Sequence, residues 1–422
     1  MKQNTCCLLC GGGVSQVLSL TPTPIANNLE APGSPPSGAT YPLDLFLCDE
    51  CGHLQLGVTV DPELLFRNYT YVSPPGMREH WAQHAGHCVP RFGLREGDLV
   101  AEAGSNNGDL LREYRDRGMR VLGFEPAAEI AAIARGRSIP TEEEFFTAEN
   151  AARVADLHAL RGTAKLVLAN NVFAHLAYLR DFMKAVDVFL APDGVFVYEV
   201  HDRNTLVGQG DWASCYHEHV HYWAVAPAVR FFASLGMHVF DVQPIPTHNG
   251  SLRIFVQRKG CGWKKTEAVE QFVSKEYEDG LFERSTYAAL GERVERARYD
   301  FQQLLSTLIW APINAGGPRP RVVVLGCPAK LTTLAYHFGL SSNDVAYVVD
   351  DAPTKIGKLT PGLRWPILPF EALLLDPPDI CILGAYNYAE ALVDRVRSMW
   401  RGRTLPVFLN PYPAPHVVKV AR

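Results

Sequence analysis

Tyr216, His217, Glu218 and His219 place a phenol, two imidazoles and a carboxylate within four consecutive residues of this chain. Imidazole titrates near neutral pH, and the other two groups can donate to it or orient it. A reaction that only deprotonates oxygen needs one base, so this cluster favours a harder proton removal, such as one from a carbon beside a carbonyl group. A solvated polar loop is the alternative, but the tryptophan and tyrosine residues that flank the run favour a buried or cleft position.

Four cysteines near the N-terminus have the spacing of metal ligands. Cys7 and Cys10 form one C-x-x-C pair, Cys48 and Cys51 form a second, and residues 11–47 separate them. Each pair can bind a metal ion from a tight turn, and four thiolates complete a tetrahedral zinc site. Because four thiolates leave no open position, we expect a structural zinc, with reduced, unbound cysteines as the alternative.

A strand, a glycine-rich turn and a helix follow in the order that opens a doubly wound α/β domain. The strand is predicted at 98–103, the turn reads Gly-Ser-Asn-Asn-Gly at 104–108, and a helical pattern begins at Asp109. The glycines let the backbone approach a ligand, and Glu125, which ends the next strand, can accept hydrogen bonds from both hydroxyls of a ribose. Enzymes that bind NAD and enzymes that bind S-adenosylmethionine share these features.

Two details favour S-adenosylmethionine. An acid inside the first strand can meet the cationic methionine end of this donor, and the turn departs from the dinucleotide G-x-G-x-x-G spacing. The later order also fits a methyltransferase, with a strand at 165–169 that ends in two asparagines and an antiparallel edge pair at 237–242 and 251–257. The expected donor-binding residues are therefore Glu102, Gly104, Ser105, Asn106, Gly108, Glu125, Asn170 and Asn171.

The 422 residues are too many for one core, and four segments are predicted. They are a zinc-binding domain at 1–68, a methyltransferase domain at 69–262, a helical connector and linker at 263–320, and a second small Rossmann-like domain at 321–422. In the last domain, Lys330 begins a helix after a turn, where an amine and backbone amides together can bind a pyrophosphate. A degenerate domain that only supports the active site is the alternative.

The composition has no strong charge bias. With 47% hydrophobic residues, 20% charged residues and a formal net charge of −5, it gives no electrostatic reason to expect nucleic acid or a membrane surface as partner. No apolar stretch has the length of a membrane span, and the N-terminus lacks the apolar core of a signal peptide. We therefore expect a cytoplasmic protein, either a monomer or a homodimer.

The chain resembles the sugar C-methyltransferases of deoxysugar biosynthesis, which add a methyl branch to carbon 3 of a nucleotide-linked 4-keto-6-deoxyhexose. The motifs stand in the family's order over nearly the whole chain. They are the two C-x-x-C pairs, Gly-Ser-Asn-Asn-Gly at 104–108, Asn-Asn-Val-Phe-Ala-His at 170–175, Tyr-His-Glu-His at 216–219, Thr-His-Asn-Gly-Ser-Leu-Arg at 247–253 and Gly-Cys-Pro-Ala-Lys at 326–330. The runs at 216–219 and 248–253 are specific, whereas the glycine turn is not. Asn107 departs from the aspartate that is usual in the family.

The resemblance implies a S-adenosylmethionine-dependent C-methyltransferase (EC 2.1.1) that acts through an enolate. It implies that His219 is the base, that Tyr216 assists at the reacting centre, and that Glu218 can hold an imidazole in the needed tautomer. His175, which could also be a surface histidine, would help to stabilise the enolate oxygen. Tyr71 is preferred slightly over Tyr69 as the tyrosine that the family places near the sugar.

The substrate contacts are open at this stage. His248 and Asn249 are expected to bind substrate, and Arg253 is either an ordinary surface arginine or a ligand of the substrate phosphates. The nucleotide is of the thymidine or guanosine diphosphate type, in natural-product or surface-glycan biosynthesis. One rival is a zinc-knuckle methyltransferase that acts on RNA or another small molecule, with a basic surface. The other is a non-catalytic nucleotide-binding protein.

Overall fold

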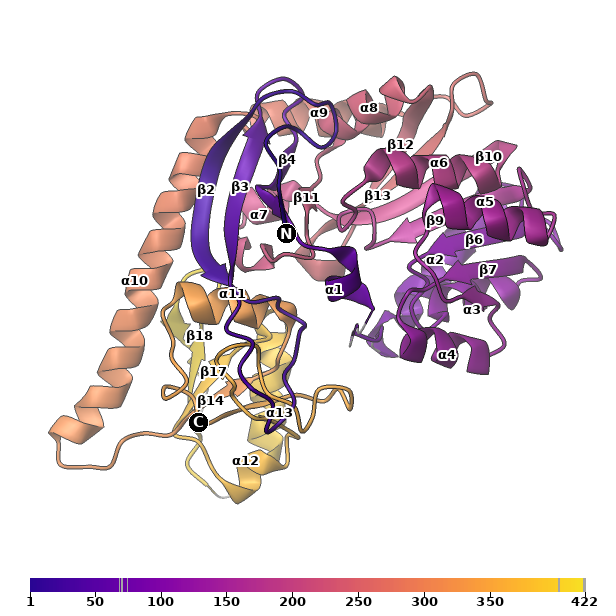
Figure 1. Ribbon diagram of the computed structural model, residues 1–422. Coiled ribbons are helices and arrows are strands. Elements are labelled where there is room, and N and C mark those ends of the chain that lie inside the picture. Colours follow the sequence, from indigo (N-terminus) through magenta and orange to yellow (C-terminus); the bar gives the residue numbers. More distant parts are fainter. Residues whose placement is uncertain (68, 70, 74, 401–402, 420–422) are drawn as a thin grey trace. The chain divides into compact units, whose positions relative to one another are not determined.

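The computed structural model describes residues 1–67, 69, 71–73, 75–400 and 403–419, which form two compact units (Figure 1). The first unit comprises residues 1–15, 46–204 and 220–282, and the second comprises residues 16–45, 205–219 and 283–422. The chain passes between the units within β2 (Val14–Thr23), β3 (Tyr41–Cys48) and α7 (Arg203–Val207), and also after residues 219 and 282. The boundary predicted at residue 68 and the predicted domain end at 420–422 lie outside the described residues.

The first unit is built on one mixed sheet in the order β12-β13-β10-β9-β6-β7-β8. Its parallel strands are β6 (Leu99–Ala103), β7 (Arg120–Phe124), β8 (Thr141–Glu142), β9 (Ala164–Asn170) and β10 (Leu190–His201). The edge pair is antiparallel and consists of β12 (Met237–Ile245) and β13 (Ser251–Arg258). The α/β fold class and the antiparallel edge pair predicted from the sequence are confirmed.

Helices cover both faces of this sheet, so its central strands β6 and β9 are buried along nearly their whole length. One face packs against α5 (Ala148–Leu157), α6 (Leu179–Phe189) and α8 (Val225–Ser234). The other face packs against α2 (Arg78–Arg91), α3 (Asp109–Arg115) and α4 (Ala128–Gly136). In open α/β sheets, ligands bind at the carboxyl ends of the strands.

Short elements at the N-terminus complete the first unit. β1 (Lys2–Gln3) pairs antiparallel with β5 (Val58–Thr59), and β4 (Leu54–Leu56) pairs antiparallel with β11 (His221–Tyr222). α1 (Pro62–Phe66) begins after Asp61, whose carboxylate accepts the backbone N–H of Glu63. α9 (Glu267–Glu278) closes the unit, and the buried carboxylate of Glu276 accepts two backbone N–H groups at the start of α8.

The second unit contains a further doubly wound sheet in the order β16-β15-β14-β17-β18-β19. Its strands are β14 (Val322–Leu325), β15 (Tyr347–Val349), β16 (Ile367–Leu368), β17 (Ile380–Leu383), β18 (Val407–Asn410) and the antiparallel β19 (His416–Val417). Its helices are α10 (Arg284–Asn314), α11 (Ala329–His337), α12 (Ala372–Leu375) and α13 (Ala389–Met399). None of the helices among the described residues is both long enough and apolar enough to cross a membrane.

Candidate metal centre, donor site and base cluster

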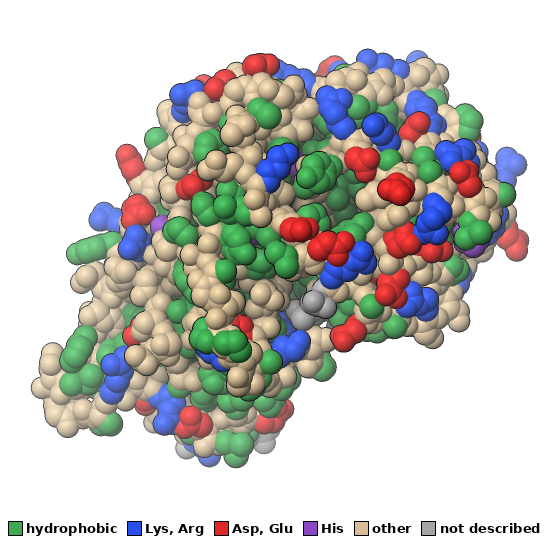
Figure 2. Space-filling model, in the orientation of Figure 1, with side chains coloured by type: hydrophobic (Ala, Val, Ile, Leu, Met, Phe, Trp, Pro, Cys, Tyr) green, Lys and Arg blue, Asp and Glu red, His purple; other side chains and the backbone are tan. Residues whose placement is uncertain are grey.

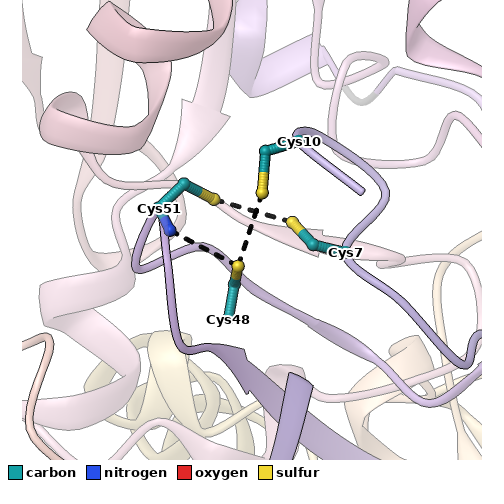
Figure 3. Close-up of side chains that lie close together, drawn as sticks. All are labelled: Cys7, Cys10, Cys48 and Cys51. Atoms are coloured by element: carbon teal, nitrogen blue, oxygen red, sulfur yellow. Dashed lines mark hydrogen bonds between the residues drawn. The ribbon is translucent and has the colours of Figure 1, made fainter. Parts of the chain in front are cut away.

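The four predicted zinc ligands converge in the first unit (Figure 3). The Sγ atoms of Cys7, Cys10, Cys48 and Cys51 all lie within 4.8 Å of one another, with 3.6 Å between Cys7 and Cys51 and 3.5 Å between Cys10 and Cys48. A tetrahedral zinc with Zn–S bonds of about 2.3 Å separates its sulfurs by about 3.8 Å, so the donor set fits this metal. The predicted structural zinc site is confirmed.

Backbone N–H groups point to the sulfur atoms of this centre and stabilise negative charge on them. The N–H of Gly12 points to Cys10 Sγ at 3.4 Å, and the N–H of Cys51 points to Cys48 Sγ at 3.4 Å. Among the thiols alone, a hydrogen bond from Cys51 lowers the pKa of Cys7 to about 5, whereas burial raises the pKa of Cys10 to about 11. Four ionised sulfurs in one small volume repel one another, so a bound cation with two charges stabilises the set.

The glycine turn after β6 is built for close backbone approach. Gly104 has φ +61°, and a Cβ at this position would lie 2.4 Å from the Val172 side chain. Asn106, also with positive φ, accepts the backbone N–H of Ser73 at 3.0 Å and donates to the Tyr71 carbonyl at 3.0 Å. The segment that carries Tyr71, the tyrosine predicted to lie near the sugar, is therefore hydrogen-bonded directly to the glycine turn at 104–108, which we call the donor loop.

Two buried acids flank this turn. Glu102 is 4% exposed, and its Oε2 atom has no hydrogen-bond partner among the described residues. Burial and the neighbouring Glu199 carboxylate raise its pKa well above the usual range. Glu125 accepts the backbone N–H groups of Asn106 at 3.0 Å and Ala127 at 2.9 Å, yet burial raises its pKa to about 7.

The asparagines after β9 and the serine of the turn contribute further polar atoms. Asn170 Oδ1 and Ser105 Oγ are buried and have no partner in the described part of the chain, while Asn171 has a positive φ of 57°. Buried polar atoms without partners are costly and mark a place where a ligand supplies the missing hydrogen bonds. These atoms and the acid Glu102 fit a zwitterionic nucleoside such as S-adenosylmethionine.

The sequence interpretation missed a charged network that lies among the first unit's core strands. Glu199, in β10, is fully buried, accepts from His80 Nε2 at 2.8 Å and pairs with Arg253 at 2.6 Å. Burial alone would raise the pKa of Glu199, but the His80 hydrogen bond and the charge of Arg253 lower it to about 2. The signal for this network was present as histidines at 80, 84 and 87, which share one face of α2.

The sequence interprets Arg253 either as a surface arginine or as a ligand of the substrate phosphates, and its environment in the structure differs from both. It is 5% exposed and lies in the middle of the β10–β13 pairing, so it is not a surface arginine. Its guanidinium group pairs with Glu199, a partner 54 residues away that no local pattern indicates. The charge offered to substrate phosphates is thus already paired inside the domain.

His175 lies among aromatic side chains of the first unit. Its ring stacks on Phe66 with a centroid distance of 5.8 Å, and Phe66 contacts Tyr69, which in turn contacts Tyr71. Burial lowers the pKa of His175 to about 4, so the ring is neutral at pH 7. His248 and Asn249 have φ values of +55° and +68°, a conformation that is rare outside glycine and concentrates at functional sites.

The Tyr216–His219 run lies in the second unit, where the hydrogen bonds define one tautomer. His219 Nδ1 lies 2.9 Å from the Ser214 carbonyl, and Nε2 lies 2.7 Å from the Tyr216 hydroxyl. Because a carbonyl oxygen can only accept, Nδ1 carries the proton of the neutral ring and Nε2 keeps its lone pair. The run therefore presents a basic nitrogen with a phenol as its hydrogen-bond donor.

The other two members of the run have different partners. The Glu218 carboxylate accepts both hydrogen bonds of the Asn27 amide group, at 2.9 and 2.8 Å. The Ser214 carbonyl sets the tautomer of His219. That Glu218 holds an imidazole in the needed tautomer stays a prediction. His217 is buried and donates to the Pro42 carbonyl at 3.1 Å, and burial lowers its pKa.

Lys330 lies at the start of α11, as predicted, and has an internal partner. Its Nζ atom lies 2.6 Å from Asp211 Oδ2, and Asp211 is fully buried. The Tyr386 hydroxyl donates to the other oxygen of Asp211, and the Lys330 ammonium lies 5.2 Å from the Tyr386 ring centroid. The positive charge that the sequence offered to a pyrophosphate is neutralised by this carboxylate.

Family models cover most of the chain. The model described as "Putative zinc binding domain" matches residues 7–66, "Methyltransferase domain" matches 77–234, and "C-methyltransferase C-terminal domain" matches 246–409. With the donor loop and the thiol centre, these matches define a S-adenosylmethionine-dependent methyltransferase with a structural zinc site. C-methyltransferase NovU of Streptomyces niveus is 32% identical over 418 residues, which cover 98% of this chain and 96% of the relative. The chain belongs to this family of C-methyltransferases.

Solved structures with low sequence identity also match part of the chain. Geranyl diphosphate C-methyltransferase from Streptomyces coelicolor A3(2) is 14% identical with a TM-score of 0.33, over 42% of this chain and 80% of that chain. The PH0226 protein from Pyrococcus horikoshii OT3 is 16% identical with a TM-score of 0.36, over 48% of this chain and all of that chain.

Proposed function

We propose that this C-methyltransferase methylates carbon 3 of a nucleotide-linked 4-keto-6-deoxyhexose, with His219 as the base. The observation that carries the proposal is the tautomer of His219, whose Nδ1–H bonds the Ser214 carbonyl. This bond leaves the lone pair on Nε2, the atom that the Tyr216 hydroxyl contacts. A proton on carbon next to a ketone needs a positioned base that titrates near neutral pH, and imidazole meets this requirement.

The Tyr216 hydroxyl first turns its hydrogen away from His219 Nε2 and so frees the lone pair of that nitrogen. His219 Nε2 then takes the proton from carbon 3, and the electron pair of the broken C–H bond moves into an enolate whose negative charge rests on the ketone oxygen. S-adenosylmethionine, when bound, would supply the methyl group as an electrophile: carbon 3 would bond to the methyl carbon as the ketone is restored, and the broken C–S bond would leave its electron pair on sulfur, giving neutral S-adenosylhomocysteine. The proton stays on the imidazole, and the Ser214 carbonyl and the Tyr216 oxygen both accept from the resulting imidazolium.

The residues of the first unit have complementary roles in this proposal. Glu102 and Asn170 receive the methionine end of the donor, and Glu125 receives the ribose hydroxyls. His175 donates an N–H group to the enolate oxygen, and its neutral state at pH 7 supports this, because a neutral imidazole still donates from one nitrogen. Tyr71, attached to Asn106 of the donor loop, contacts the sugar.

The surface supports a small-molecule substrate over RNA. On the face shown in Figure 2, basic and acidic side chains are interspersed, and the formal net charge of the chain is −5. An RNA methyltransferase gains most of its affinity from clustered lysine and arginine side chains that contact phosphates.

The substrate is tested directly by incubating the enzyme with S-adenosylmethionine and a panel of nucleotide-linked sugars in deuterated water. The panel pairs thymidine and guanosine diphosphate 4-ketosugars with their 4-hydroxy counterparts. We expect a methyl branch at carbon 3 of a 4-ketosugar, and deuterium at carbon 3 when S-adenosylhomocysteine replaces the donor. Methylation of the 4-hydroxy sugars, or of oxygen, would overturn the enolate route.

The base is tested with His219→Gln, and His217→Gln serves as the matched control two residues away. We expect kcat of His219→Gln to fall by about 10²- to 10⁴-fold, with unchanged affinity for S-adenosylhomocysteine. His217→Gln should retain turnover, because a glutamine amide can also donate to the Pro42 carbonyl. Unchanged turnover in His219→Gln would remove this residue from the role of base.

A further inference from the structure

α11 makes two contacts with the segment that leads to the base, both inside the second unit. Lys330 bonds the Asp211 carboxylate, and Thr333 Oγ1 donates to the Cys215 carbonyl at 2.6 Å. The two residues are three apart, so they lie on the same face of the helix. Trp212 adds an apolar contact, because its ring packs edge-on against His337, also in α11, at a centroid distance of 5.0 Å.

A continuous set of hydrogen bonds connects this anchor to the base. The Asp211 carbonyl accepts the Ser214 backbone N–H at 3.1 Å and the Ser214 hydroxyl at 2.5 Å, which closes the short helix η2 (Trp212–Ser214). The Ser214 carbonyl accepts Nδ1–H of His219, and His219 Nε2 contacts Tyr216. The side chain of Asp211 therefore fixes the end of the turn whose other end defines the tautomer of His219.

The energetics favour a fixed Asp211. A fully buried carboxylate must be compensated by charge and hydrogen bonds, and here an ammonium group and a phenol hydroxyl supply both. The Lys330 side chain is 14% exposed, so solvent screens this pair only weakly. Rotation of Asp211 away from these partners would leave a buried charge, and the turn is held in one arrangement for this reason.

We propose that Asp211 is a positioning residue for the His219–Tyr216 pair, that Lys330 of the C-terminal domain acts on the reaction through it, and that Thr333 of the same domain holds the same turn at the Cys215 carbonyl. This inference rests on the proposed role of His219 as base. It gives Lys330 a task that differs from phosphate binding. It also gives the second Rossmann-like domain a part in deprotonation that needs no contact between Lys330 and the substrate.

The test uses the full-length enzyme and the variants Asp211→Asn and Thr333→Val, with Lys355→Met as the matched control. Lys355 is also a nearly buried lysine of the same domain (12% exposed), and it bonds the Cys327 carbonyl. Asp211→Asn keeps the shape and loses the charge. Thr333→Val keeps the Asp211–Lys330 pair intact, so it reports on the turn even if the first variant folds poorly.

We expect kcat and the rate of deuterium exchange at carbon 3 to fall together, by about 100-fold in Asp211→Asn and about 10-fold in Thr333→Val. KM for the donor should not change, and Lys355→Met should match the wild type. Selective ¹⁵N labelling of histidine gives a second readout. His219 should have a protonated Nδ1 in the wild-type enzyme and a mixture of tautomers in Asp211→Asn.

Two outcomes overturn the positioning role. One is an unchanged kcat in a folded Asp211→Asn or Thr333→Val enzyme, and the other is a fall in kcat with the His219 tautomer unchanged. The proposed role of His219 as base is tested separately, because only turnover by the His219→Gln enzyme would reject it. An inactive His219→Gln enzyme beside fully active Asp211→Asn and Thr333→Val enzymes would retain the base and reject only the positioning role.

Discussion

We predict that donor binding depends on pH through Glu125, the proposed ligand of the ribose. Its carboxylate stands at the end of β7, accepts two backbone N–H groups, and still has a pKa raised to about 7 because it is buried. Only the ionised form can accept hydrogen bonds from both ribose hydroxyls with its two oxygens. In the proposed role, protonation and donor binding therefore compete for the same carboxylate.

The size of the effect follows from this pKa. Affinity is lost as pH falls through the pKa of the free enzyme, because a ligand that binds the ionised form must first remove the proton. With a pKa of about 7, the ionised fraction is about 0.9 at about pH 8 and about 0.1 at about pH 6, so affinity falls by about 10-fold. In the ligand-free protein, the contribution of Glu125 to folding stability changes with pH in the opposite direction. Since burial raises this pKa above its unfolded value, its contribution to stability is full below the unfolded pKa and is lost as pH rises through about 7.

Calorimetric titration with S-adenosylhomocysteine across this pH range, at constant ionic strength, measures the effect. The matched control is Glu125→Gln, which keeps an acceptor for one backbone N–H group but cannot ionise. We expect weaker binding in this variant and a flat dependence on pH over the same range. A constant affinity in the wild-type enzyme, or the same slope in Glu125→Gln, would refute the assignment of this titration to Glu125.

Three further outcomes are expected. Arg253→Met should lower the free energy of unfolding by about 3–5 kcal/mol in urea denaturation, since it leaves the buried Glu199 charge without its guanidinium partner; a wild-type midpoint would contradict this. Tyr198→Phe should leave stability unchanged or raise it by about 1 kcal/mol, because this hydroxyl is buried without a partner among the described residues; a clear loss would reveal an essential bond. Elemental analysis should find about one zinc per chain, and Cys48→Ser should lose the metal and destabilise the N-terminal lobe while donor binding persists; full stability without zinc would exclude a structural role.

Local patterns were sufficient for the sheet of the first unit and for the metal centre. Strands buried on both faces are apolar runs bounded by turns, so β6, β9 and β13 were predicted to within one or two residues. The spacing of the cysteines is itself the geometry of a zinc knuckle. Strands and C-x-x-C knuckles depend on residues that are close in the sequence, so both could be predicted from local patterns.

The arrangement around the base depends on residues far apart in sequence. Asp211 and Lys330 are separated by 119 positions, and Asn27 and Glu218 by 191, so no periodicity indicates either pair. The partner of His219 Nδ1 is a backbone carbonyl, and residue type carries no information about which carbonyl is near. The predicted domain boundaries 1–68, 69–262, 263–320 and 321–422 also stay a prediction. Each of these predicted domains is one continuous segment, whereas each compact unit of the structure combines segments that are far apart in the sequence.

The zinc centre closes a loop. Its two knuckles bracket residues 11–47, and this stretch supplies Asn27, which binds Glu218, and the Pro42 carbonyl, which binds His217. A metal that joins the two ends of such a stretch removes most of its freedom before any of its own contacts form. A bound ion would therefore act on the Tyr216–His219 run through chain entropy. We therefore expect chelation to loosen the partners of Glu218 and His217 and to lower turnover, although this zinc would take no part in the chemistry.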